Sequence, residues 1–230
     1  MILTAAFAAI RQVFSPPLRQ IVLRSLGLTV VLLIFVWGLL TKGLDLLLAA
    51  HPLSADYPVL NTFAYFAGGA GLVVLLVFLL PPVSALVGGF FLDEAAAIVE
   101  TTDFPQDRPG APLSTWSSIR SGLRFAGLSL LLNLAALALI FVPVVNVTAF
   151  FAVNTYLLGR EYFEMAAARF RPAAEASELR RRNRLPVLAG GAVLAGLMLV
   201  PVLNLLTPVF GIALMVHLHK EIARQPAAPR

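Results

Sequence analysis

Val142-Pro143-Val144-Val145-Asn146 is the stretch that decides the fold, and Val200-Pro201-Val202-Leu203-Asn204 repeats its pattern. In each copy a proline interrupts an uncharged apolar run, and an asparagine follows soon after it. Proline lacks a backbone N–H and disfavours a helical residue before it, so we expect each incoming helix to end just before the proline. Asparagine is a favourable N-cap, so Asn146 and Asn204 are predicted to begin the outgoing helices. The pattern therefore predicts two helical hairpins with uncharged tips.

The composition predicts an all-α integral membrane protein. Of the 230 residues, 59% are hydrophobic and 13% are charged, with a mean hydropathy of +0.88, whereas a soluble protein is about 25% charged. The chain contains no cysteine, which excludes disulfides and thiolate metal sites. Its net charge of +5 is attributed to arginines on the cytoplasmic side of a membrane, and no nucleic-acid partner is expected.

The first residues predict a short helix that lies on the bilayer surface. Leu3, Phe7, Ile10 and Phe14 recur at intervals that place them on one helical face, and the prolines at 16 and 17 separate this segment from the long helix that follows. We expect a single membrane domain over residues 1–230. Its predicted parts are an interfacial helix (1–14), long helices (18–50 and 62–100), a first hairpin (119–164), a second hairpin (185–224) and a tail (225–230).

Charge distribution predicts the topology. The loop 51–61 has no lysine or arginine, whereas residues 160–184 hold seven arginines and four glutamates. Because cytoplasmic segments are enriched in basic residues, both termini are predicted to be cytoplasmic. The uncharged outgoing arm 147–158 has a length of about 18 Å at 1.5 Å per residue, which is short for a core about 30 Å thick. We therefore expect two spanning helices, with the hairpins either dipping in from the cytoplasmic side or just reaching across.

These features resemble the CysZ sulfate transporter family, which shares a superfamily with the eukaryotic etoposide-induced membrane protein. The resemblance rests on Ser15-Pro16-Pro17-Leu18-Arg19, on Leu80-Pro81-Pro82 with acidic residues after it, and on the arginine-rich segment 169–184. Its most specific part is Val200-Pro201-Val202-Leu203-Asn204-Leu205, followed by Pro208 and Gly211. The resemblance implies a bacterial inner-membrane protein with spanning helices and embedded hairpins. It also implies oligomers and sulfate uptake for cysteine synthesis.

The resemblance also implies where the anion binds. Leu18 and Arg19 stand where family members carry a Gly-Leu-Arg-like motif associated with sulfate binding, although Pro17 here replaces the glycine. The first turn of a helix favours anions, so Arg19 is the first candidate ligand; the alternative is a topology anchor whose charge reaches the interface. Another Gly-Leu-Arg, at 122–124, precedes the first hairpin.

Three arginines near the mouth of the first hairpin form a second candidate site. Arg120 and Arg124 lie one turn apart, and Arg160 ends the other arm, so together they could form a cationic funnel. Salt pairing of these arginines with Glu161 and Glu164 is at least as plausible. At the tips, beside Pro143 and Pro201, the two asparagines could contact substrate, but capping explains their spacing better.

No sequence pattern points to an enzyme. HExxH, P-loop and GxSxG motifs are absent from the sequence, and His217 and His219 lie on different faces of a helix, so we expect no catalytic residue, metal site or cofactor. The leading hypothesis is an inner-membrane transporter of sulfate or a similar small oxyanion, in contact with lipid and assembled as a dimer or larger homo-oligomer. The alternative is a membrane scaffold or assembly factor that does not transport.

Overall fold

The computed structural model describes residues 1–50, 58–112 and 143–224, together with single helical positions at 116, 120, 123, 127, 130, 131 and 134. In this part of the chain every regular element is a helix, which confirms the predicted all-helical class. The helices are α1 (Ile2–Val13), α2 (Pro16–Ala50), α4 (Pro58–Asp103), α6 (Pro143–Ala168), α7 (Ala173–Arg182), α8 (Arg184–Met198), α9 (Pro201–Asn204) and α10 (Thr207–Arg224).

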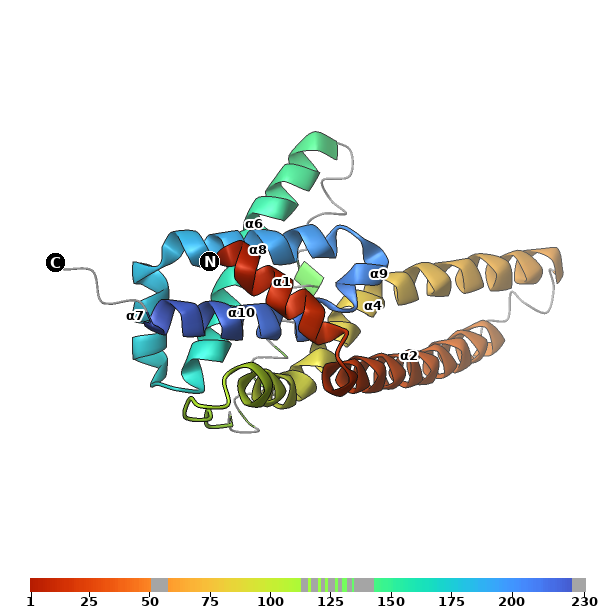
Figure 1. The fold of residues 1–230 in the computed structure, drawn as a ribbon. Helices are drawn as coiled ribbons and strands as arrows, with labels where there is room; N and C mark the ends of the chain where they lie inside the picture. The colour runs from red at the N-terminus through yellow and green to blue at the C-terminus, as the bar shows by residue number, and fades with distance from the viewer. Residues whose placement is uncertain are drawn as a thin grey trace.

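Two long helices project from the rest of the molecule as a pair. α2 and the first part of α4 run side by side, and Figure 1 shows them extending beyond the other helices. α2 and the segment Thr62–Leu80 are each long and apolar enough to cross a membrane, and Phe35 and Phe66 are among their exposed side chains. Lipid is the environment in which such exposed apolar surface is stable.

The proline pair in α4 changes the direction of the helix without ending it. The sequence predicts an end or a kink at Pro81-Pro82, and the helix continues to Asp103. In Figure 1 the gold first part and the yellow second part of α4 run in different directions. The second part of α4 thereby leaves α2 and reaches the other helices, where Ala95, Ala96 and Val99 are buried.

α10 is the central helix of the remaining bundle. Every residue from Thr207 to Lys220 is buried, and α1, α4, α6 and α8 pack around it (Figure 1). A helix that is apolar on all sides is expected to be enclosed, and most of α10 has this character. Close packing extends to its start, because a Cβ on Gly88 would lie 2.5 Å from Pro208.

α1 packs on the bundle through small residues and presents its large apolar residues outward. Ala5, Ala9 and Gln12 are buried. The predicted apolar face is indeed one stripe, and it is exposed: Leu3, Phe7, Ile10 and Phe14 are between 46% and 71% exposed. The stripe therefore points away from the protein, as an interfacial helix requires.

The predicted asparagine caps are wrong in both copies of the repeat. α6 begins at Pro143, so Asn146 lies inside its first turns, and α10 begins at Thr207, after Asn204 has closed the single turn α9. The reason is that proline suits the first position of a helix, where its missing N–H has no partner to lose. Val200 is extended, as expected of a residue before proline, and the chain reverses there between α8 and α10.

The helix leaving the first proline is also longer than its uncharged part. α6 runs for 26 residues and carries Arg160, Glu161 and Glu164 within the helix, so the outgoing arm extends beyond residue 158 to Ala168. The incoming arm of this predicted hairpin falls mostly outside the described residues. Among the described helices, α6 packs most extensively against α8, and this crossing brings its charged end close to α7 and α8.

Candidate functional site

Four arginines from three helices converge on one pocket, which we call the arginine pocket. It has a volume of about 410 Å³. Its lining residues are Arg160 and Tyr156 of α6, Arg180 and Arg181 of α7, and Arg184, Val187 and Leu188 of α8. The chain bends between α7 and α8 at Asn183, so the arginines on either side of the bend face a common space. Such a cluster of guanidinium groups favours an anion with several acceptor oxygens.

One carboxylate neutralises part of this charge. Glu164 accepts a hydrogen bond from Nε of Arg180 over 2.7 Å, and Nε of Arg160 lies 3.7 Å from the same carboxylate oxygen. Arg181 and Arg184 are exposed and form no ion pair with any residue that the structure describes. The pocket therefore keeps an excess of positive charge that is available to a ligand.

Of the proposed arginines that the structure describes, Arg160 lines the arginine pocket and Arg19 and Arg120 do not. Arg160 lines the pocket, and it also pairs with Glu164, as the salt-pairing alternative predicts. Arg120 is exposed and does not line the pocket, and Arg124 lies outside the described residues. Arg19 is exposed in the first turn of α2, and its backbone N–H already donates to Ser15 O over 2.8 Å. Leu18 is fully buried in the core.

Arg180, Arg181 and Arg184 were missed as site residues by the sequence reasoning. They belong to the arginine-rich segment that predicts a cytoplasmic location, and this interpretation treats every basic residue alike. A usable signal was present, because Arg182 and Glu178 form an exposed pair four residues apart whereas Arg181 and Arg184 have no acidic residue at the corresponding position. This local comparison distinguishes Arg181 and Arg184 from an arginine that is paired within its own helix.

A buried ionic network holds the loop after α4 against α6. Arg169, which is nearly inaccessible, donates to Glu100 from Nε over 2.6 Å and also pairs with Asp93. Glu100 in turn accepts from the backbone N–H of Gly110 over 2.9 Å, and Ala111 N–H donates to the backbone oxygen of Arg169 over 2.7 Å. The guanidinium of Arg169 and the carboxylates of Glu100 and Asp93 are thus paired with one another, so we assign this network to stabilising the fold.

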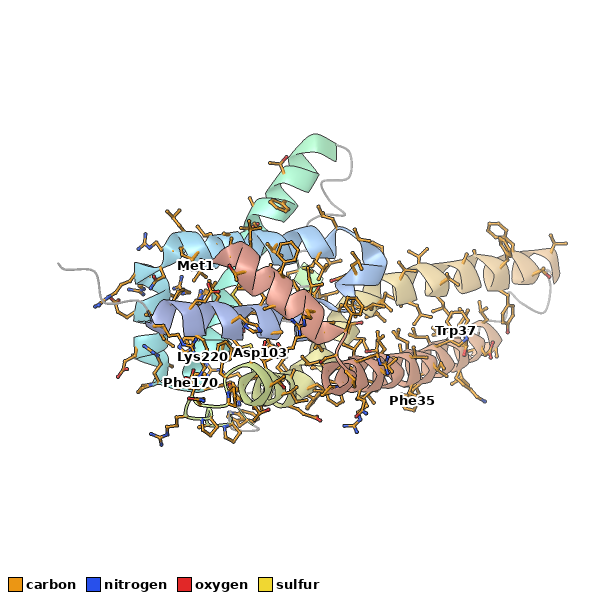
Figure 2. The ribbon with its side chains drawn as sticks, in the orientation of Figure 1. Met1, Phe35, Trp37, Asp103, Phe170 and Lys220 are labelled. Carbon is orange, nitrogen blue, oxygen red and sulfur yellow. The ribbon has the colours of Figure 1, made fainter. Side chains whose placement is uncertain are left out.

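The charged end of α10 forms a second enclosed cluster. Lys220 pairs with Asp107 over 3.1 Å and lies 4.1 Å from the ring centroid of Phe170. Figure 2 labels Lys220 and Phe170 at this end of the bundle. The bond from Lys220 is the largest cause that lowers the pKa of Asp107 below its usual value. His219 stacks on Phe170 with ring centroids 5.1 Å apart, and burial lowers its pKa to about 4.

His217 faces a different set of neighbours, as its two-residue separation from His219 predicts. Its Nε2 lies 3.0 Å from Gln12 Oε1 and 3.3 Å from Asp103 Oδ2. Burial lowers the pKa of His217, and the carboxylate of Asp103 acts in the opposite direction. Through these contacts, His217 of the central helix holds α1 and the end of α4 in place. His217 therefore packs inside the bundle, and it does not line the arginine pocket.

Comparison with known proteins identifies a family. The family model described as sulfate transporter CysZ/etoposide-induced protein 2.4 matches residues 5–208. The matched range begins within α1 and ends at the start of α10, and it includes all four arginines of the pocket. No curated protein matches the chain.

Proposed function

This chain belongs to the sulfate transporter CysZ/etoposide-induced protein 2.4 family, and from that membership we propose that it carries sulfate, or a closely similar oxyanion, across a bacterial inner membrane. The family is of the transporter type, and two helices are suited to span a membrane. Uptake of sulfate for cysteine synthesis is the proposed role. A membrane scaffold without transport is the less favoured alternative.

The convergence of Arg160, Arg180, Arg181 and Arg184 is the observation that carries the proposal. Arginines that only mark topology are expected to lie scattered at the lipid interface, with their charges in solvent. Here guanidinium groups from α6, α7 and α8 face one pocket, and two of them lack an acidic partner in the described chain. Arginine binds tetrahedral oxyanions through paired, charge-assisted hydrogen bonds. The arrangement suits the capture of a small oxyanion at the charged end of the bundle.

We propose the following membrane arrangement. α2 and the first part of α4 span the bilayer, α1 lies at its cytoplasmic surface through the exposed apolar stripe, and the α8–α10 reversal dips in from that side. The arginine-rich α7 is then cytoplasmic, as are both termini. In this arrangement the pocket faces the cytoplasm, and it would hold the anion at the end of its path.

Arg19 is a second proposed contact, separate from the arginine pocket. It is exposed at the start of α2 and forms no ion pair with another described residue. Arg19→Ala is expected to weaken sulfate binding by on the order of tenfold, and Arg19→Lys to restore part of it, because lysine keeps the charge without the planar fork. Arg11→Ala is the matched control, since Arg11 lies on the interfacial helix.

We also propose a homo-oligomer. Among the small residues of α4, Gly69 and Gly71 have open space where a Cβ would stand, so their face is available to a second copy of the chain. A hairpin inserted halfway also needs protein around its tip. Mass measurements in mild detergent and in lipid nanodiscs should give a dimer or larger species, and a strict monomer in both would contradict this.

Sulfate uptake by purified protein in liposomes tests the function directly. Proteoliposomes should accumulate labelled sulfate above protein-free liposomes, and excess unlabelled sulfate should compete. The Arg181→Ala/Arg184→Ala double variant should lose most of this uptake while keeping its thermal unfolding profile. Folded wild-type protein that gives no uptake above the protein-free level would favour the scaffold.

A further inference from the structure

We infer that Glu164 is a built-in competitor of the anion, a carboxylate that occupies guanidinium groups of the arginine pocket and so keeps anion affinity moderate. This inference rests on the proposed function and concerns the regulation of the same site. Glu164 lies on α6, one turn after Arg160, and reaches toward α7. No role in the anion's path follows from its position in the sequence, where it is one of several glutamates among arginines.

The contacts of Glu164 reproduce those of a bound oxyanion oxygen. A single atom, Oε1, accepts from Nε of Arg180 over 2.7 Å and from the hydroxyl of Ser177 over 3.2 Å, and lies 3.7 Å from Nε of Arg160. This oxygen therefore accepts from one guanidinium and one hydroxyl, with a second guanidinium nearby, and guanidinium and hydroxyl groups are also donors that suit a sulfate oxygen. The carboxylate of Glu164 thus interacts with Arg160 and Arg180, two of the four arginines that line the pocket.

The degree of burial makes this competition effective. The side chains of Arg180 and Glu164 are 14% and 26% exposed, so solvent and salt screen this pair less than they screen the exposed pair Arg182–Glu178, at 61% and 52%. An incoming oxyanion can bind Arg181 and Arg184 at once, but must share or displace Glu164 to reach Arg180. A site on a transport path has to release its ligand, so moderate affinity favours turnover.

A simpler role is that Glu164 only ties α7 to α6. The two roles predict opposite effects of Glu164→Gln, which removes the charge and keeps an oxygen that can accept from Arg180 and Ser177. If Glu164 only links α7 to α6, Glu164→Gln should lower the thermal unfolding temperature and leave the affinity for sulfate the same or weaker. If Glu164 competes with the anion, Glu164→Gln should raise the affinity for sulfate, because one negative charge beside four arginines has been removed.

The experiment compares Glu164→Gln with Glu178→Gln, which removes an equivalent charge from a pair outside the pocket. Sulfate binding to the purified full-length protein is measured at low ionic strength in chloride-free buffer, and uptake is measured in liposomes. Glu164→Gln should bind sulfate about fivefold or more tightly and show slower maximal uptake. Glu178→Gln should match wild type in both measurements.

The outcomes separate this inference from the function on which it rests. Wild-type binding with no tightening in Glu164→Gln, in protein with an unchanged unfolding temperature, overturns the role of Glu164 alone. Tightening by Glu178→Gln of the same size also overturns it, because the effect would then be one of overall charge. If neither wild type nor Glu164→Gln binds sulfate, the proposed function and this inference both fall.

Discussion

Arg169 shows how little of a residue's role can be deduced from its place in a charged segment. The sequence places it among seven arginines that predict a cytoplasmic face. In the structure it is almost fully buried, and its partners Glu100 and Asp93 lie 69 and 76 positions earlier in the chain. No local pattern links residues so far apart. The sequence shows that these residues are charged, and only the fold, in which α4 and α6 both pack on α10, brings them together.

Arg169→Ala is expected to destabilise the bundle strongly. Removing one partner of a buried ionic network leaves its carboxylates without compensation, at a cost of about 3–5 kcal/mol. The apparent unfolding temperature in detergent should therefore fall well below that of wild type. Arg182→Ala is the control, since Arg182 sits in an exposed pair within one helix and should change stability by at most about 0.5 kcal/mol. Equal stability of the two variants would show that the network contributes nothing.

At the scale of the helices, periodicity and proline positions were informative. The stripe from Leu3 to Phe14, the two long apolar helices and the reversal near Pro201 follow from apolar spacing and from the missing N–H of proline. The capping residues were assigned wrongly, because proline and asparagine both signal a helix start and the sequence does not rank them. The central position of α10 was also not predictable, since an apolar helix can be enclosed by protein or by lipid.

The crossing of α6 and α8 provides a test at this scale. A Cβ on Gly191 would lie 1.9 Å from the backbone oxygen of Thr155, and one on Gly159 would lie 2.7 Å from Val187 O. Since backbone cannot move aside like a flexible side chain, Gly191→Ala should separate the helices and cost about 1–3 kcal/mol or more. Its unfolding temperature in detergent should fall, and the arginine pocket formed by the same helices should bind sulfate less well.

Gly196→Ala on the same helix is the matched control. A Cβ there meets no atom within 4 Å, and alanine is the better helix former, so the variant should be as stable as wild type. The structure places the close contact between α8 and α6 at Gly191 and Gly159. A glycine becomes a contact point only where its partner is also small, and Gly159 is far away in the sequence. A destabilised Gly196→Ala with an intact Gly191→Ala would contradict the crossing.

The insertion depth of the hairpin tips is a further prediction about the elements. The chain has no cysteine, so single cysteines at Val145 and Leu203 can be labelled without background. If the hairpins dip in from the cytoplasm, an impermeant reagent added outside should label neither position, and a cysteine in the loop 51–57 should label readily. Ready labelling of both tips from outside would show that these arms cross the bilayer completely.

At the scale of the whole molecule, two helices that are long and apolar enough to span a membrane adjoin a helical bundle. α2 and α4 contain these two segments, α10 lies at the centre of the bundle, and α6, α7 and α8 line the arginine pocket. Sequence reasoning reached the membrane class and the family, which the match over residues 5–208 confirms. It did not reach the pocket, because three of its four arginines had been explained by topology alone.

Equilibrium sulfate binding to purified protein is the measurement that tests the central claim most directly. The comparison is between wild type, the Arg181→Ala/Arg184→Ala double variant, and Arg182→Ala, which removes a neighbouring arginine that does not line the pocket. The double variant should bind at least about tenfold more weakly, since each charge-assisted hydrogen bond contributes roughly 1.5 kcal/mol or more. Arg182→Ala should bind as wild type does. Wild-type affinity in the folded double variant would contradict the assignment of the arginine pocket as the anion site.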